Sequence, residues 1–371
     1  MTCGLMKVNI SNKIEQQADL MFYFPGFASY MEYICVNAIE PEWKSLDQFV
    51  INELQNVFAL DALSSSHQIS VEVENPDQIN EIFDSISYAK GASVIRSMEN
   101  FLTSDVFKGG LRKYLKKFSY QTATQDDLWH ELTMEARLQG VLDETMSVKE
   151  IMDTWTLQIG FPFVTVTRNY ENNQINLQQD RFMLIEATEN ATKHAAHQET
   201  QKNLWYVPIT LTTSSELSFN NTKPSHWMKA TKNIVFEKDI KNADWLILNI
   251  QVTGYYRVNY DLANWKLIIN HLNNPKKFKE IAPANRAQLM DDALNLARAD
   301  ILDYRTALEV TKYLVHEVDY VPWKTAINGL NYIDSMLIRS PDYDKFKVFL
   351  FIIFFYYDLI NTFIPIEIFS S

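Results

Sequence analysis

Apolar residues recur along this chain with two different spacings, and the change of spacing divides it into three parts. Between residues 26 and 158 they return every three or four positions, the period of one face of an α-helix. Between residues 161 and 260, short runs alternate apolar and polar positions, which is the period of a β-strand. The helical period returns at Trp265. The pattern therefore predicts helices, then strands, then helices.

The individual elements follow from these runs and from the residues that interrupt them. Pro41 ends the first helical run, and Gly160-Phe161-Pro162 marks the change to strands. Short strands with Asn/Ser/Thr-rich turns over about 100 residues are typical of a small β-sandwich. The helices after Trp265 are typical of the start of a helical repeat array, whose units need stacked neighbours. Predicted helices span 26–38, 43–62, 90–102, 105–118, 126–137 and 148–158, and predicted strands span 163–167, 175–177, 207–211, 245–248 and 254–260.

The last part of the chain changes character at Val348. Residues 348–357 are wholly apolar or aromatic. A membrane-spanning helix needs about 20 mostly apolar residues, and Asp358, Pro365 and Glu367 fall within that window. No small-residue cleavage site with a polar spacer precedes the run, as a lipid anchor would require. We therefore do not expect residues 348–357 to form a membrane-spanning segment.

Composition narrows the class of protein. With 371 residues the chain is long enough for two or three domains. Its net charge of -12 argues against nucleic acid as a partner, because phosphate binding needs clustered Lys and Arg. Cys3 and Cys35 are the only cysteines, too few for a disulfide framework or a structural zinc cluster.

Targeting and modification signals leave the localisation open. Residues 1–21 do not read as a signal peptide, because charged residues such as Lys7 and Asp19 interrupt any apolar run. Three triplets match the acceptor sequence for N-linked glycans, and they begin at Asn9, Asn190 and Asn220. In a chain rich in asparagine such triplets also arise by chance.

The run G-F-A-S-Y-M-E-Y from Gly26 to Tyr33 resembles the zinc aminopeptidases of the aminopeptidase N family. The resemblance implies an N-E-G-F-A-S run whose glutamate, directly before the glycine, binds zinc. Here Phe24-Pro25-Gly26 stands in place of N-E-G, so Pro25 occupies the ligand position. The H-E-x-x-H helix that holds the other ligands would lie further upstream, and the 25 residues before Gly26 do not contain it.

A second motif, S-Y-A-K-G-A-S-V from Ser87 to Val94, resembles the family's S-Y-x-K-G-A-S-V run. The resemblance implies that Tyr88 is the inherited transition-state stabiliser, a phenol that donates a hydrogen bond to the oxyanion of the tetrahedral intermediate. Such a donor contributes a few kcal/mol, about 3 in typical cases. Periodicity alone would instead favour a tyrosine that packs at a helix end against the core.

Further landmarks extend the resemblance over residues 26–347. They are M-D-T-W-T-L-Q-I-G-F-P from Met152, G-Y-Y-R-V-N-Y-D from Gly254, and N-R-A-Q-L-M-D-D-A from Asn285. The implied fold class is multidomain α+β: the helical C-terminal part of a thermolysin-like catalytic domain, a β-sandwich, then the start of an α-helical domain. The expected bounds are 1–25 for a non-family segment, 26–160 for the partial catalytic domain, 161–262 for the sandwich, 263–347 for the helical domain and 348–371 for a non-family apolar tail. We expect residues 1–25 and 348–371 to be translated intron or mis-joined sequence.

Three further groups imitate catalytic motifs. His130-Glu131-Leu132-Thr133-Met134 begins like H-E-x-x-H but ends in methionine, which cannot replace imidazole at zinc; His130 and Glu131 are expected to face solvent. His194 and His197 have the spacing of a helical metal pair, but no third ligand is suggested. Glu99, in S-M-E-N, is expected to be a solvated helix residue.

The resemblance implies a parent enzyme that binds one zinc ion and removes N-terminal residues from peptide substrates, typically at the extracellular face of the plasma membrane. Because the zinc ligands are missing, this chain is expected to bind no zinc and to be inactive, with Tyr88 its one inherited site residue. Three interpretations stay open: an incomplete copy of an active aminopeptidase, a non-catalytic relative that binds a peptide or a protein, and a fragment that does not fold stably.

Overall fold

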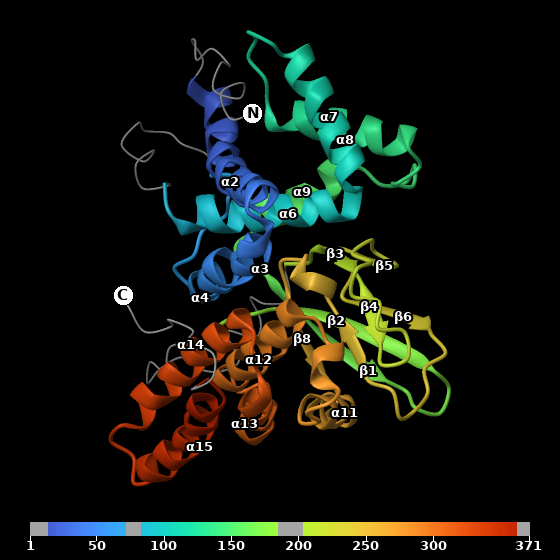
Figure 1. Ribbon diagram of the computed structural model, residues 1–371. Helices are drawn as coiled ribbons and strands as arrows, with labels where there is room; N and C mark the ends of the chain where they lie inside the picture. The colour runs from blue at the N-terminus through green and yellow to red at the C-terminus, as the bar shows by residue number, and fades with distance from the viewer. Residues whose placement is uncertain (1–13, 72–82, 185–202, 362–371) are drawn as a thin grey trace.

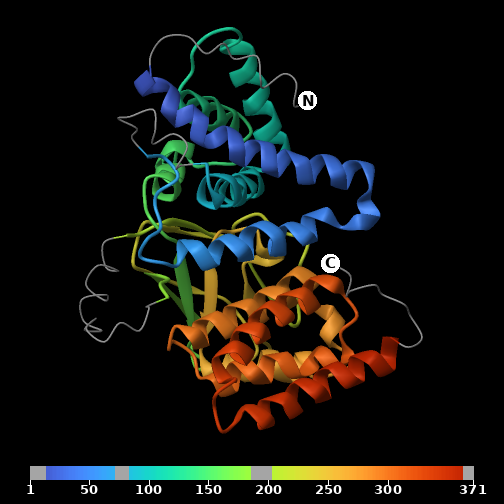
Figure 2. The same ribbon diagram turned by 90° about the vertical axis from the view of Figure 1, so that its left-hand side faces the viewer.

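The structure is a computed structural model, and it describes residues 14–71, 83–184 and 203–361; the side chains of residues 14–24 and 354–361 lie outside the description. Strands occupy the middle of the molecule, with helices on two sides of them (Figures 1 and 2). We name the three parts the N-terminal helical region (residues 14–156), the β region (162–260) and the C-terminal helical region (262–361). This is a mixed helix-and-sheet protein, as the apolar spacing predicts.

The N-terminal helical region is built on two long helical segments that cross. Thr124 and Ser147 begin their helices with capping boxes, each side chain accepting a hydrogen bond from the third residue of the helix. The elements are α2 (Ile14–Ile39), η1 (Pro41–Trp43), α3 (Ser45–Phe49), η2 (Val50–Gln55), α4 (Asn56–Asp61), η3 (Ile86–Lys90), α6 (Gly91–Leu102), α7 (Ser104–Lys117), α8 (Gln125–Leu138) and α9 (Val148–Thr156).

The first helix departs from the prediction. It was expected to begin at Gly26, but α2 starts at Ile14 and continues through Pro25. Two other segments, η2 and η3, are π-helical turns inserted in longer helices. A period of 3.6 residues does not reveal such insertions, because each adds only one residue to a turn.

The β region contains three small sheets. Strands β6 (Asn233–Glu237), β2 (Gln174–Arg181), β1 (Pro162–Arg168) and β8 (Arg257–Tyr260) form one sheet in that order. Strand β1 pairs antiparallel with β2 and parallel with β8. The two-stranded sheets are β3 (Tyr206–Ile209) with β5 (His226–Lys229), and β4 (Leu211–Thr213) with β7 (Leu246–Leu248).

The sequence predicts five strands, whereas the described residues contain eight. The expected strand 207–211 is interrupted at Thr210 and contributes to two sheets, and the expected strand 254–260 begins only at Arg257. Before it, the Asn249 side chain donates to the Gly254 carbonyl at 3.0 Å and accepts from the Gly254 amide at 2.8 Å. The Asn249 side chain therefore binds the backbone groups of Gly254 that a neighbouring strand would otherwise bind. Strands β5 and β6 were not predicted.

The C-terminal helical region packs against the β region and against η2. No described helix is both long and apolar enough to cross a membrane. The run 348–357 instead continues α15, whose Phe346 and Ile353 are buried while Val348 and Phe351 are exposed. The elements are α11 (Leu262–Leu272), η5 (Phe278–Glu280), α12 (Pro283–Arg298), α13 (Tyr304–Thr311), η6 (Lys312–His316), α14 (Tyr320–Leu337) and α15 (Tyr343–Asn361).

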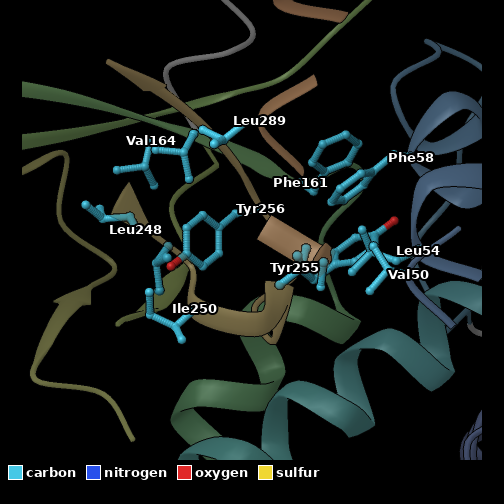
Figure 3. Close-up of a cluster of buried hydrophobic side chains, with 14 of the residues drawn as sticks. Val50, Leu54, Phe58, Phe161, Val164, Leu248, Ile250, Tyr255, Tyr256 and Leu289 are labelled. Carbon is cyan, nitrogen blue, oxygen red and sulfur yellow. The ribbon is translucent and has the colours of Figure 1, made fainter. Parts of the chain in front are cut away.

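The three regions share one hydrophobic core. In Figure 3, side chains from η2 and α4 meet side chains from the β region, and Leu289 of α12 lies beside them. The rings of Phe58 and Phe161 stack at 4.2 Å, and Phe58 lies 4.8 Å from Tyr255. Removing any of these side chains would open a cavity at the junction, so the regions stabilise one another.

A buried arginine joins the β region to α12 within this core. Arg257 Nη1 lies 2.5 Å from Asp291 Oδ2 and 3.0 Å from Asp292 Oδ1. The Val258 amide donates to Asp292 Oδ2 at 3.0 Å. Burial, with a smaller contribution from Asp291, raises the pKa of Asp292 to about 7, although Arg257 opposes the shift.

We expect this carboxyl to make stability depend on pH. Its pKa in the folded state lies above the ordinary value of 3.8, so the folded protein binds the proton more tightly than the unfolded chain. The stabilising contribution is complete below the ordinary pKa and is lost as the pH rises through about 7. Urea unfolding over a range of about pH 4 to 8 should show a decline in stability that the Asp292→Asn variant lacks. Asp342→Asn, at an exposed position, should keep the wild-type slope.

Candidate functional site

Tyr88 lies on the π-helical turn η3, at the start of the long segment that continues as α6. Asp84 stabilises this turn, because its Oδ1 accepts from the amides of Ile86 at 2.9 Å and Ser87 at 3.1 Å. The Tyr88 amide donates to the Asp84 carbonyl at 3.0 Å. The Tyr88 side chain is 40% exposed, and its ring lies 6.3 Å from that of Phe83. Tyr88 is therefore presented to solvent from a well-anchored turn.

His67 supports the same turn from outside. Its Nε2 lies 2.9 Å from Asp84 Oδ2, and its Nδ1 lies 2.8 Å from the Gln68 carbonyl. Both carboxylate oxygens of Asp84 are thus engaged, one with His67 and one with the amides of η3. The expectation that Tyr88 would pack against the core, which periodicity alone favoured, is not what the structure shows.

Two residues after Tyr88, Lys90 forms a fully buried ion pair. Its Nζ lies 2.9 Å from Asp61 Oδ2, and neither side chain is exposed. The same ammonium donates to the Gly160 carbonyl at 3.0 Å. Burial lowers the pKa of Lys90, and Asp61 opposes that shift.

Besides the Lys90 ammonium, Asp61 accepts hydrogen bonds from three other parts of the chain. Its Oδ1 accepts from Ser66 Oγ at 2.6 Å and from the Gly160 amide at 3.1 Å. Its Oδ2 accepts from the Tyr255 hydroxyl at 3.1 Å, across 194 positions of sequence. We call Asp61, Lys90, Gly160 and Tyr255 the junction cluster. It ties the segment that carries Tyr88 to the entrance of β1 and to the approach to β8.

The sequence did not indicate the junction cluster. Lys90 and Tyr255 both lie inside quoted motifs, but nothing in their spacing shows that they meet at Asp61. Asp61 lies at the end of a helix, and its sequence context predicts an ordinary surface residue. The one available signal was a lysine inside an otherwise small and apolar run, A-K-G-A-S-V.

Helix α2 crosses this segment at a pair of glycines. A Cβ on Gly26 would lie 2.7 Å from the Gly91 carbonyl carbon and 2.9 Å from the Ala92 amide nitrogen. The two backbones are therefore in direct contact, and α2 packs along η3 and α6. Pro25, next to the crossing, is buried. The position that the resemblance assigns to a zinc-binding glutamate thus lies beside the segment that carries Tyr88, and it holds a side chain without a donor atom.

Glu99 corrects one expectation. It is half-buried rather than solvated, and it accepts hydrogen bonds from the Tyr30 hydroxyl at 2.6 Å and from Ser104 Oγ at 2.7 Å. Burial, with Glu99 adding to it, raises the pKa of Tyr30 far above its ordinary value. Glu99 therefore stabilises the packing of α2 on α6. Its neighbour Met98 is fully buried.

The histidines that imitate a metal motif do not form a site. His130 is exposed on α8, as expected, whereas Glu131 is half-buried and lies 2.6 Å from Lys117 Nζ. His194 and His197 lie outside the described residues. Among the side chains that the structure describes, no three His, Cys, Asp or Glu residues gather as they would around a metal ion. The described side chains therefore do not fit a zinc centre.

The chain matches two family models, the first in the N-terminal helical region and the second running from inside the β region into the C-terminal helical region. Residues 19–155 match the Peptidase family M1 domain. Residues 245–354 match the ERAP1-like C-terminal domain. The chain belongs to the M1 peptidase family. The M1 match covers the α2 crossing, Tyr88 and Lys90, so the candidate site lies inside the peptidase part.

Curated relatives support the same family. The chain is 42% identical to aminopeptidase N of Oryctolagus cuniculus over 332 residues, which cover 88% of this chain and 32% of the relative. It is 39% identical to aminopeptidase N of Mus musculus over 328 residues, or 88% of this chain and 32% of the relative. It is 40% identical to aminopeptidase Ey of Gallus gallus over 318 residues, or 85% of this chain and 31% of the relative. The chain thus spans about a third of the length of these relatives.

Proposed function

We propose that this M1 relative carries the carbonyl-binding side of an aminopeptidase site, with Tyr88 as the hydrogen-bond donor to a peptide carbonyl, and that this polypeptide alone does not hydrolyse peptides. The observation that carries the proposal is the contrast between two neighbouring positions. Tyr88 is exposed on an anchored turn, whereas Pro25, beside the adjoining glycine crossing, offers no ligand.

The chemistry that Tyr88 can supply is limited to a hydrogen bond. A phenol donates its proton to a carbonyl oxygen and stabilises negative charge that develops there. It supplies neither a nucleophile nor an activated water. In the parent family those functions fall to zinc and its ligands, which this chain's described residues do not provide.

The proposed domain organisation follows the same relatives. We propose that the N-terminal helical region is the helical part of a thermolysin-like catalytic domain, ending near residue 160. The β region would be the sandwich, up to residue 262, and the C-terminal helical region the start of a helical repeat domain up to residue 347. The M1 match over residues 19–155 and the ERAP1-like match over residues 245–354 support this order.

The proposal is tested by measuring zinc content and hydrolysis of an alanyl-anilide by the purified chain. We expect no stoichiometric zinc and no turnover, because a single hydrogen-bond donor cannot activate water. Pro25→Glu restores one carboxylate at the ligand position and should still give no turnover. Stoichiometric zinc together with turnover that Tyr88→Phe slows would contradict the proposal.

Peptide binding without hydrolysis is a second candidate function. The exposed ring pair of Phe83 and Tyr88 supports it, since aromatic side chains with a polar end are favoured at binding surfaces. Calorimetric titration of a short peptide onto the chain would detect such binding. Weakened binding in Tyr88→Phe but not in Tyr120→Phe, at a position 78% exposed, would assign it to this site.

A further inference from the structure

The connection between β4 and β5 (residues 214–225) contains an exposed segment held at both ends. Before it, the Ser218 amide donates to Thr212 Oγ1 at 2.8 Å, and the buried Phe219 accepts at its carbonyl from Gln251 Nε2 at 3.1 Å. After it, the Ser225 amide donates to the Ile209 carbonyl at 2.9 Å. The residues between these anchors form a short segment on the surface of the β region.

This surface segment contains Asn220-Asn221-Thr222, and the side chains of its two asparagines differ in their hydrogen bonding. Asn221 Oδ1 accepts from the Lys223 amide at 3.2 Å, so its side chain shapes the turn. Asn220 is exposed, and its carboxamide forms no hydrogen bond to any residue that the structure describes. Only Asn220 is followed by Thr two positions later, because Lys223 stands at that place for Asn221.

We propose that Asn220 is an N-glycosylation site, modified when the chain passes through the secretory pathway. The acceptor triplet requires Asn-x-Ser/Thr with x other than proline, and Asn-Asn-Thr satisfies it. The donor is an oligosaccharide linked to a lipid diphosphate. The Asn220 Nδ2 forms a bond to the anomeric carbon, the bond from that carbon to the phosphate oxygen breaks, and Nδ2 loses one proton. The lipid diphosphate leaves with the bonding electrons, so no oxidant or reductant is needed.

The folded structure accommodates a glycan at the exposed Asn220 but not at the buried asparagines in this part of the molecule. Asn249 and Asn264 are fully buried and hold backbone groups of the β region through their amides. A sugar on Asn220 would extend into solvent without displacing a hydrogen bond. The anchors at Phe219 and Ser225 involve backbone groups and buried rings, which the modification leaves unchanged. The proposal is independent of Tyr88, which lies in the N-terminal helical region.

The test is site-resolved mass spectrometry of the full chain expressed in insect cells behind a secretion leader. A tested acceptor triplet placed between the leader and Met1 reports entry into the pathway. Enzymatic deglycosylation in heavy-oxygen water converts each glycosylated asparagine into labelled aspartate. We expect the label at Asn220, and we expect Asn220→Gln and Thr222→Ala to abolish it.

Matched variants separate loss of the acceptor from loss of the fold. Thr222→Ser and Asn221→Gln both retain an acceptor triplet, so both should keep the label at Asn220. Asn220→Gln should unfold at the wild-type temperature, because the side chain holds no described residue. An unlabelled Asn220 in molecules whose leader triplet is labelled would overturn the proposal. Labels at Asn9 or Asn190 do not bear on it, because the measurement resolves each site.

Discussion

Replacing Lys90 with methionine is expected to destabilise the protein by about 3–5 kcal/mol, because it leaves Asp61 as a buried carboxylate without its counter-charge. The pair has no exposed atoms to which water could return. The Gly160 carbonyl loses its donor at the same time. Chemical unfolding followed by far-ultraviolet circular dichroism measures the change directly.

Two controls show whether the loss comes from the buried charge. Lys345→Met removes a lysine whose partner Asp342 is also exposed, and it should change stability by less than about 0.5 kcal/mol. Asp61→Asn combined with Lys90→Met removes both charges but keeps an oxygen for the Tyr255 hydroxyl. The double variant should recover part of the lost stability. A Lys90→Met protein as stable as wild type would show that the junction cluster does not hold the regions together.

Gly26→Ala is expected to cost about 1–3 kcal/mol, the usual range for overpacking a tight contact. The new methyl group would meet the backbone of Gly91 and Ala92 at 2.7 and 2.9 Å, so one helix has to move. Alanine otherwise favours a helix over glycine by about 1 kcal/mol, and that gain opposes the clash. Thermal unfolding of the purified variant should show a lower midpoint than wild type.

The partner glycine provides the matched control. A Cβ on Gly91 would lie 3.3 Å from the Gly26 Cα, a contact that a small shift relieves. Gly91→Ala should therefore be close to neutral, because the gain in helix propensity and the slight crowding oppose each other. Equal losses from the two substitutions would contradict the crossing geometry. Because α2 packs on η3, Gly26→Ala should also disturb the surroundings of Tyr88 more than Gly91→Ala does.

Part of the fold could be predicted because the signals are local. Helices α7, α8 and α9 carry strong apolar periodicity, and Thr124 and Ser147 mark two of their beginnings through capping side chains. Strand β1 lies within one residue of its predicted ends, since apolar and polar positions alternate along it. Strand β6 escaped prediction because none of its residues is fully buried, so its apolar positions carry little pattern.

The elements that failed depend on distant contacts. Helix α2 was expected to begin at Gly26, where apolar positions start to recur at helical spacing, and proline inside a helix removes a backbone hydrogen bond. It nevertheless continues on both sides of Pro25, with Gly26 packed on Gly91. Glu99 was expected in solvent because a glutamate on a helix is usually exposed. The Tyr30 hydroxyl and Ser104, which bind it, come from other helices.

By itself, the sequence determined the family and the candidate residue. The motifs around Gly26 and Tyr88 are runs of adjacent residues, so they can be identified without knowledge of the fold. The sequence also shows directly that position 25 is proline and not glutamate. Only the tertiary structure decided how Tyr88 is held. Its turn is anchored by Asp84 nearby and by Lys90 paired with Asp61, and that pair is bound in turn by Tyr255 from 194 positions away. Burial makes such a charge pair strong and costly to break, and burial is a property of the packed chain rather than of any stretch of its sequence.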